Sequence, residues 1–459
     1  MTSWLGIARF GLVQAALGAI VVLTTSTINR VMIVELALPA MVPGLLVTWH
    51  YALQVLRPSW GHGSDKGGRR TPWIVAGMGT LALGGFGAAL SVHLMAQDML
   101  LGALAAIVSF TLIGAGVGAA GTSLLVLLAN QVDETRRAAA ATIVWIMMIA
   151  GFIVTAALAG HFLDPFSTGR LLAVAACICT GSFLLTLVAV RGLETGRRSE
   201  RQDAEKVPFR QAIAEVWADR TARRFAIFIF VSMLAYSAQD LILEPFAGLV
   251  FGLTPGQSTA LSGVQNSGVL LGMVLVGIAS TLVPRLMTLR SWTVTGCIGS
   301  ALALAGLVMA ARVGPGWPLK PSVFALGFCN GVFAVAAIGS MFNMANSGTS
   351  REGVRMGLFG ASQAIAFGIG GFAGTALADA SRMVLGSPVM AYATVFAVEA
   401  GFFIVAALLA AAVGNRQGFG AAANPLVLAA RHQVVDRLCQ HGRDDLRPGG
   451  GGRRPLGRH

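Results

Sequence analysis

A few ionisable side chains interrupt the long apolar stretches of this sequence. A charge in such surroundings is costly, so each one is a candidate for ligand binding, gating or proton transfer. The ionisable residues inside the stretches are Arg30, Glu35, Asp240, Glu244 and Glu399. Amide side chains stand directly beside two of them. The predicted ligand or gate site is therefore made of Asn29, Arg30, Glu35, Gln239, Asp240 and Glu244.

Other kinds of reactive chemistry have no signature here. The five cysteines include no C-x-x-C pair and no Cys/His spacing typical of a metal site. No G-x-x-x-x-G-K-[ST] phosphate loop occurs, and the glycines from Gly114 to Gly118 follow no strand, so they indicate helix packing. We therefore expect no metal centre, no covalent cofactor and no enzymatic activity.

The composition indicates what kind of fold must hold these side chains. Of the 459 residues, 55% are hydrophobic and 12% are charged, about half of the ~25% that soluble proteins carry. A soluble protein of this size needs a larger polar shell, whereas the 58 glycines suit close helix packing in lipid. The composition predicts a polytopic protein with membrane lipid as its surroundings.

Hydropathy divides the chain into apolar stretches of about 20 residues, the length that a membrane-spanning helix needs. The short alternating strands of a membrane barrel are not seen. We expect an all-α membrane protein with twelve transmembrane helices. The predicted spans are 10–29, 36–56, 73–93, 100–129, 139–160, 171–190, 225–249, 258–283, 292–311, 322–344, 357–379 and 389–413.

The basic residues predict the orientation of these spans. If the N-terminus lies inside, 28 of the 33 lysines and arginines fall on the inner side. Such an excess is typical of cytoplasmic loops, so both termini are expected in the cytoplasm. The net charge of +13 is then explained by topology and by attraction to anionic lipid. Nucleic acid is not an expected partner.

The longest polar segment between spans divides the chain into two halves. Residues 1–190 are predicted to form an N-terminal six-helix bundle, and residues 225–413 a C-terminal one. Residues 191–224 form a cytoplasmic linker, and the basic tail 414–459 is expected to be mostly disordered. The halves are also related internally: a shift of 219 residues places Gly151 on Gly370 and Arg136 on Arg355. Duplicated halves imply a pseudo-two-fold axis and a central cavity.

The two charged clusters are expected to meet across that axis. At a helical rise of 1.5 Å per residue, Arg30 and Asp240 both lie toward the outer ends of their spans. Since these two spans face each other in a duplicated fold, Arg30 is expected to pair with Asp240 or Glu244. Two interpretations stay open: an outer gate or polar ligand site, or an ion pair that only holds the halves together.

The loop between the second and third spans reads G-x-x-x-D-K-x-G-R-R. This pattern resembles the loop signature of the major facilitator superfamily, whose fold has the two six-helix bundles expected here. The glycines permit a tight turn, and Thr71 is placed to cap the next helix, with Pro72 at its first position. The resemblance implies a cytoplasmic conformational lock. Its predicted members are Gly61, Asp65, Gly68, Arg69, Arg70, Arg136, Glu352 and Arg355.

Two segments resemble a narrower branch of that superfamily. Residues 10–75 and the run AQDLILEPFAG at 238–248 are similar to the PucC/LhaA-type proteins, the bacteriochlorophyll-delivery branch, and the similarity runs from about residue 5 to 413. The resemblance implies an assembly factor for light-harvesting complexes. Its cargo would be bacteriochlorophyll and its partners antenna polypeptides and pigment-synthesis enzymes, in the bacterial inner (intracytoplasmic photosynthetic) membrane.

His50 gains a specific interpretation from this resemblance. A neutral imidazole is able to bind the magnesium of a chlorophyll, although a lone histidine in a span is more commonly a hydrogen-bonded core residue. An alternative function also stays open. The chain would then be a proton-coupled secondary transporter of a small or amphipathic solute, with Asp240 or Glu244 carrying the proton.

Overall fold

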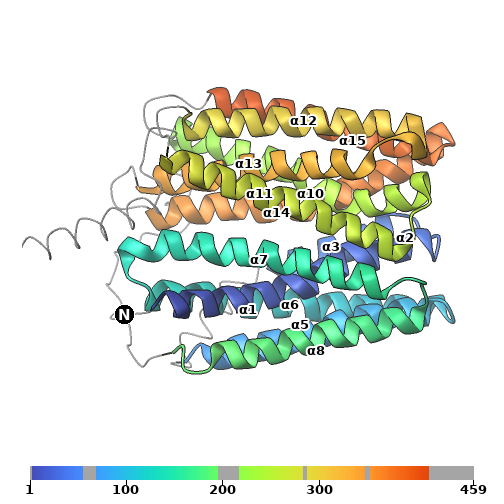
Figure 1. Cartoon of the computed structure of the whole chain (residues 1–459), viewed down its shortest axis with the longest axis horizontal. Coiled ribbons are helices and arrows are strands. Elements are labelled where there is room, and N and C mark those ends of the chain that lie inside the picture. Colours follow the sequence, from blue (N-terminus) through green and yellow to red (C-terminus); the bar gives the residue numbers. More distant parts are fainter. Residues whose placement is uncertain (1–2, 55–68, 195–216, 283–286, 347–351, 413–459) are drawn as a thin grey trace, which may run out of the picture.

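The computed structural model describes residues 3–54, 69–194, 217–282, 287–346 and 352–412 (Figure 1), and within these ranges every regular element is a helix. The first half contains α1 (Trp4–Val22), the π-helix η1 (Leu23–Ile28), α2 (Asn29–Val34), α3 (Met41–Leu53), α5 (Thr71–Met95), α6 (Met99–Gln131), α7 (Glu134–Phe162) and α8 (Thr168–Val190). The second half contains α10 (Arg220–Phe251), α11 (Pro255–Leu282), α12 (Leu289–Val313), the 3-10 turn η3 (Gly314–Gly316), α13 (Leu319–Asn346), α14 (Glu352–Leu385) and α15 (Pro388–Ala412).

Side-chain caps explain where several helices begin. Ser3 caps α1, Asp98 caps α6, Ser167 caps α8 and Thr288 caps α12. Each of these side-chain oxygens accepts a hydrogen bond from a backbone amide in the first helical turn, where no earlier carbonyl is available as a partner.

Eleven described helices are long and apolar enough to cross a membrane, starting with one continuous span from Trp4 to Val34. Their outer surfaces carry large apolar side chains such as Leu302 and Leu408, which are 68% and 65% exposed. The second predicted span, 36–56, is shorter within the described ranges, because α3 has 13 residues and residues 55 and 56 lie outside them. The prediction of an all-helical, multi-pass membrane protein is confirmed.

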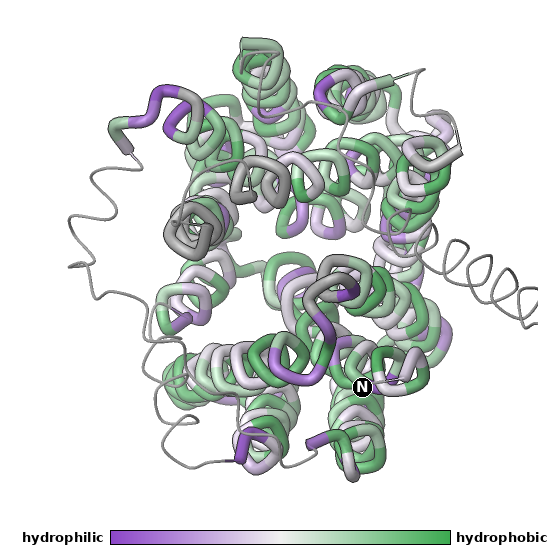
Figure 2. The backbone as a smooth tube through the Cα atoms, turned by 90° about the vertical axis from the view of Figure 1, so that its left-hand side faces the viewer, coloured by the Kyte–Doolittle hydropathy of each residue, from purple (hydrophilic) through white to green (hydrophobic). Residues whose placement is uncertain are grey.

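The helices form two groups with the same packing pattern, seen one above the other in Figure 2. In the first group, α1 packs on α7 and α8, and α5 packs on α6 and α8. In the second group, α10 packs on α14 and α15, and α12 packs on α13 and α15. The groups meet where α7 lies against α11, where α3 lies against α14, and where α10 lies against η1 and α2.

Two glycines related by the 219-residue shift make the same contact in both groups. A Cβ on Gly151 of α7 would lie 2.6 Å from the carbonyl oxygen of Ala15 in α1. A Cβ on Gly370 of α14 would lie 2.5 Å from the carbonyl oxygen of Leu234 in α10. Ala15 and Leu234 are themselves related by the same shift. Glycine is therefore required at both positions by direct contact between backbones.

We name the two ends of the bundle by the helices that begin there. The near end is where α1 begins, marked N in Figure 1, and the far end is where α3 and α11 begin. The helices run the length of the bundle between these ends, so the position of a residue along its helix gives its depth.

The paired glycines generate the first prediction. Gly151→Ala and Gly370→Ala should each lower the melting temperature of the detergent-purified protein, because overpacking of this kind typically costs about 1–3 kcal/mol. Gly181→Ala is the matched control, since a Cβ there meets nothing within 4 Å and alanine is the better helix former. The contact would be unimportant if the Gly151 and Gly370 variants melted no lower than this control.

Candidate functional site

A widened helical turn precedes the predicted charged cluster of the first span. The π-helix η1 separates α1 from α2, and such turns occur frequently at functional sites. The hydroxyls of Thr24 and Thr25 both donate to the carbonyl of Val21, at 2.8 and 2.9 Å. The widened turn changes the direction in which Asn29 and Arg30 point, relative to an uninterrupted α-helix.

Arg30 is the largest fully buried side chain of the described chain, with 2% of its surface exposed. Its Nη1 lies 2.5 Å from Oε1 of Glu35, in the same predicted cluster. Its Nη2 donates to the carbonyl of Leu253, at 2.8 Å, in the connection between α10 and α11. Gly248 of α10 leaves the space for the guanidinium, since a Cβ there would lie 3.0 Å from Nη2. Arg30 therefore joins the two halves through a backbone carbonyl.

The predicted ion pairs of Arg30 with Asp240 and Glu244 are wrong, since the described residues show neither contact. Glu244 is 1% exposed, and its carboxylate accepts hydrogen bonds from the hydroxyls of Ser262 at 2.5 Å and Thr259 at 3.4 Å. Arg30 acts on Glu244 by charge alone. The reason is local: an acid only five positions along the chain reaches the guanidinium without crossing the interface.

Two further side chains of the first span contact the second half beside this cluster. Asn29 is 1% exposed, and its Nδ2 donates to the carbonyl of Leu241 in α10, at 2.8 Å. The hydroxyls of Thr27 and Thr259 are 3.1 Å apart, joining η1 to α11. The far half of the first span is thus held against α10 and α11 by buried polar contacts.

Two carboxylates clamp helix ends across the interface at the far end. Asp379 of α14 accepts hydrogen bonds from the amides of Ala40 and Met41, at 3.0 and 2.7 Å, where α3 begins. Asp164, which follows α7, accepts a hydrogen bond from the hydroxyl of Thr254, at 2.8 Å, where α11 begins. A carboxylate at the N-terminus of a helix is favoured by unpaired amides and by the helix dipole. These contacts join the two halves at the far end.

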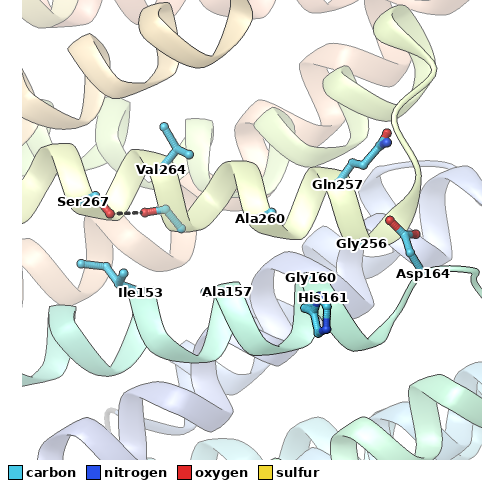
Figure 3. A pocket seen from close by; sticks show the side chains of 11 residues that line it. Ile153, Ala157, Gly160, His161, Asp164, Gly256, Gln257, Ala260, Val264 and Ser267 are labelled. Carbon is cyan, nitrogen blue, oxygen red and sulfur yellow. Dashed lines mark hydrogen bonds between the residues drawn. The ribbon is translucent and has the colours of Figure 1, made fainter.

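A groove of about 440 Å³ runs between α7 and α11 (Figure 3). Both halves contribute to its lining, which consists largely of small residues. Ala157 and Gly160 come from α7, and Ala260 and Gly263 come from α11. The hydroxyl of Ser267 donates to the carbonyl of Gly263, at 2.8 Å, and so is already satisfied. The groove therefore presents mainly apolar surface, which suits an elongated apolar ligand.

Aromatic side chains form a continuous string through the middle of the bundle. The rings of Tyr51 and Phe367 are 5.7 Å apart, those of Phe367 and Tyr236 are 5.9 Å apart, and those of Tyr236 and Phe333 are 6.4 Å apart. The string passes from α3 to α14, then to α10 and α13, and so crosses between the halves. Asp240 follows Tyr236 by one helical turn, and the two groups interact electrostatically.

The remaining candidates inside the spans are buried away from the far-end cluster. Gln239 is completely buried, and neither of its amide atoms has a hydrogen-bond partner among the described residues. His50 is 1% exposed, and its ring packs on Tyr51 with centroids 4.1 Å apart. The backbone of His50 lies against Gly114 of α6, inside the first half. The structure therefore brings Asn29, Arg30, Glu35 and Glu244 together, but not His50, Gln239 or Asp240.

The near end contains the described part of the predicted lock. Glu194, just beyond α8, accepts hydrogen bonds from the amides of Arg70 at 2.7 Å and Thr71 at 3.1 Å, and lies 4.0 Å from Nε of Arg69. The prediction that Thr71 caps this helix is wrong, because the acceptor is the carboxylate of Glu194. Arg136 stacks over the ring of Trp4 at 4.1 Å. Gly61, Asp65 and Gly68, with the side chains of Glu352 and Arg355, lie outside the described residues.

These contacts determine the charge state of Glu194. Partial burial by itself would raise the pKa of this carboxyl group. The hydrogen bonds from Arg70 and Thr71, and the positive charge of Arg69, outweigh burial and lower the pKa below its usual value. Glu194 is therefore ionised at neutral pH and acts as a permanent anionic cap on α5.

Sequence reasoning missed three of these features. The π-turn has no composition signal, and the helix clamps of Asp164 and Asp379 involve partners more than 80 residues away in the sequence. Glu194 lies in a stretch that was interpreted only as a linker. For the three carboxylates, the sequence shows the residue type but does not show which backbone amide or hydroxyl it contacts.

The sequence matches known proteins over most of its length. Residues 27–418 match the family model described as PUCC protein. The bacteriochlorophyll synthase 44.5 kDa chain of Rhodobacter capsulatus is 52% identical over 429 residues, covering 93% of this chain and 99% of that relative. Protein PucC of the same organism is 28% identical, covering 89% of this chain and 92% of that relative.

Solved structures identify the fold. A bacterial homologue of the human lysosomal transporter Spinster, in an inward-facing and occupied conformation, has a TM-score of 0.67 at 15% identity, covering 89% of this chain and 96% of that one. A D-xylose–proton symporter has a TM-score of 0.65 at 14% identity, covering 88% and 97%. The chain has the fold of the major facilitator transporters.

The contacts of Arg30 generate a second prediction. In a double-mutant cycle, Arg30→Gln and Glu35→Gln should be coupled by about 0.5–3 kcal/mol, because the two side chains form one ion pair. Arg30→Gln and Asp240→Asn should be additive within about 0.5 kcal/mol, because they share no contact. Unfolding free energies in detergent give both values. Coupling to Asp240 without coupling to Glu35 would contradict the observed pairing.

A third prediction concerns the cap on α5. Glu194→Gln should lower stability by about 0.5–2 kcal/mol, the usual value of a helix cap. Because the pKa of Glu194 is lowered by folding, its contribution is complete above the ordinary carboxyl range and is lost as the pH falls through the lowered pKa. Melting temperatures of wild type and variant should therefore converge in acid. A difference that persisted unchanged in acid would argue against an ionised cap.

Proposed function

The chain belongs to the PUCC protein family, and on that premise we propose that it is an assembly factor for light-harvesting complexes. It binds or delivers bacteriochlorophyll to antenna polypeptides as these complexes form in a phototrophic bacterium. Bacteriochlorophyll is cargo in this proposal, and the antenna polypeptides are the acceptors. The observation that carries the proposal is the 52% identity, over nearly the whole length of both chains, to a relative named for bacteriochlorophyll.

The groove between α7 and α11 supports a role with an apolar ligand. It spans both halves, it offers about 440 Å³, and small side chains line most of it. An elongated hydrocarbon substituent would gain about 25 cal/mol for each Å² of apolar surface removed from water. The proposal needs no catalytic group, and the sequence contains no nucleotide-binding or metal-binding pattern. We therefore assign a binding role, even though one relative carries the name of a synthase chain.

His50 stays a prediction as a magnesium ligand. Its burial against Tyr51 means that a macrocycle would reach the imidazole only after α3 and its neighbours had moved apart.

The lock at the near end is also part of the proposal. In a conformation in which the near end is closed, Asp65 would engage Glu352 and Arg355 at the start of α14. In this proposal the protein lies in the intracytoplasmic photosynthetic membrane, and both of its termini are in the cytoplasm. Pigment-synthesis enzymes are further proposed partners.

A second candidate function is proton-coupled transport of a small or amphipathic solute. The fold is shared with transporters such as the D-xylose–proton symporter, and acidic side chains are buried in α10 and α15. The two candidates differ in what the purified protein carries. Bound pigment and antenna peptides support the first, and solute uptake into liposomes driven by a proton gradient supports the second.

A deletion strain tests the first candidate. We expect the absorption bands of the assembled antenna to fall while pigment synthesis continues, because pigment and apoprotein are still made but are not joined. Complementation with the wild-type chain should restore the bands. Unchanged antenna bands, in a strain that also lacks any close relative able to compensate, would refute the proposal.

A further inference from the structure

The second half contains a buried acidic side chain that none of the contacts above explains. Glu399 of α15 is 2% exposed, and neither of its carboxyl oxygens has a hydrogen-bond partner among the described residues. α15 packs on α10, and Asp240 of α10, another acid, acts on Glu399 electrostatically. Two negative charges without a cation are the least favourable arrangement for a protein interior.

Aromatic contacts lie on both sides of this acidic pair along the bundle, one toward the near end and one toward the far end. Tyr236 precedes Asp240 by one turn of α10, and Phe403 follows Glu399 by one turn of α15. Because α10 and α15 run in opposite directions, both rings lie on the near side of the two acids. The rings of Tyr236 and Phe333 are 6.4 Å apart, and those of Phe333 and Phe403 are 5.4 Å apart. These three rings form a layer one turn away from both carboxyl groups.

A second aromatic contact lies on the far side of the pair. Phe246 of α10 and Phe396 of α15 are 5.0 Å apart in an edge-to-face arrangement, and Phe246 also packs on Tyr392 at 5.8 Å. Phe396 and Phe246 are both fully buried. Asp240 and Glu399 therefore lie in a layer between two aromatic contacts, where Glu399 is buried and Asp240 is partly buried.

We propose that Glu399 and Asp240 form a proton-binding site, in which a proton on the buried carboxyl group of Glu399 removes its charge beside a second acid. The proton is the ligand that this chemistry favours, because it removes a charge without bringing a hydration shell into the site. Neither carboxyl has the further ligands that a metal ion needs, and no group of three metal-ligating side chains occurs among the described residues.

Among the described residues, the interactions of the pair include no basic side chain that would take the place of the proton. Tyr236 lies one helical turn from Asp240, and Tyr51 and Tyr236 both pack on Phe367; neither tyrosine carries a positive charge. Tyr392 precedes Glu399 by two turns of α15, toward the far end, and lies near Asp379 and Arg382. Within the described ranges no basic side chain interacts with either carboxyl. The site is distinct from Glu244, whose carboxylate has hydroxyl donors and the nearby charge of Arg30.

Reaction with dicyclohexylcarbodiimide tests the site in the purified, full-length protein. This reagent enters apolar surroundings and reacts with protonated carboxyls: the proton passes to a reagent nitrogen, the carboxyl oxygen bonds to its central carbon, and rearrangement gives a stable N-acylurea. Peptide mass spectrometry should locate the label on Glu399 or Asp240 at neutral pH. Glu399→Gln, which keeps the shape of the side chain, should lose the label at position 399.

Coupling between the two carboxyls is the second part of the test. Removing a like charge makes the remaining group easier to ionise, so in Asp240→Asn the pH at which labelling of Glu399 is half-lost should be lower by about one unit. Asp98→Asn is the matched control, since asparagine also caps α6 and Asp98 lies outside this site. It should leave the midpoint unchanged. Gel filtration verifies that each variant is folded.

Two results would overturn the inference. One is the absence of label from both Asp240 and Glu399 at every pH, with the folded protein labelled elsewhere. The other is a midpoint for Glu399 that is the same in Asp240→Asn as in wild type, because the two groups would then titrate independently. Neither measurement involves pigment, so the result is separate from the outcome of the deletion experiment.

Discussion

Lipid offers no hydrogen bonds, so every polar group inside this bundle has to be satisfied by the protein itself, and Arg30 is the most demanding case. Its guanidinium is paired with Glu35 and donates to the carbonyl of Leu253 in the other half. The Glu35 side chain is 35% exposed, so the guanidinium is the buried member of this pair and the one that depends on its partners. The spacing between the first span and α10 is therefore constrained, and the contacts of Asn29 and Thr27 with the second half depend on that spacing.

The two ends of the bundle use polar contacts differently. At the far end, Asp379 and Asp164 each join one half to the other. At the near end, three polar contacts lie within a half: Arg9 donates to carbonyls at the end of α8, Arg290 donates to the carbonyl of Ala411, and Glu194 caps α5. In this conformation the halves are joined by polar groups at the far end.

The buried acids of the bundle fall into two classes, and the difference bears on function. Glu244 has hydroxyl donors from α11, so both of its carboxyl oxygens are hydrogen-bonded where it lies. Glu399 has no donor in the described chain and faces Asp240. An acid of the first class holds the structure together, whereas an acid of the second class changes its surroundings when it gains or loses a proton.

The sequence alone determined the class of fold and the internal duplication. Apolar stretches of membrane length and few charges leave little choice other than membrane-spanning helices, and the shift that relates Gly151 to Gly370 was readable because close backbone contact requires glycine at both places. The sequence also identified most residues of the candidate site, since a charge inside an apolar stretch is conspicuous. Arg30, Asp240, Glu244 and Glu399 were all found in this way.

Only the tertiary structure decided which of these residues meet. The π-turn at Leu23–Ile28 sets the direction of Arg30, and the pairing with Glu35 replaced the expected pairing with Asp240. Asp240 instead faces Glu399, which is 159 positions away and shows no periodic relation to it in the sequence. The physical reason is that hydropathy depends on residue type alone, whereas a hydrogen bond or an ion pair depends on the rotation of each helix about its axis. That rotation is set by packing between segments that are distant in the chain.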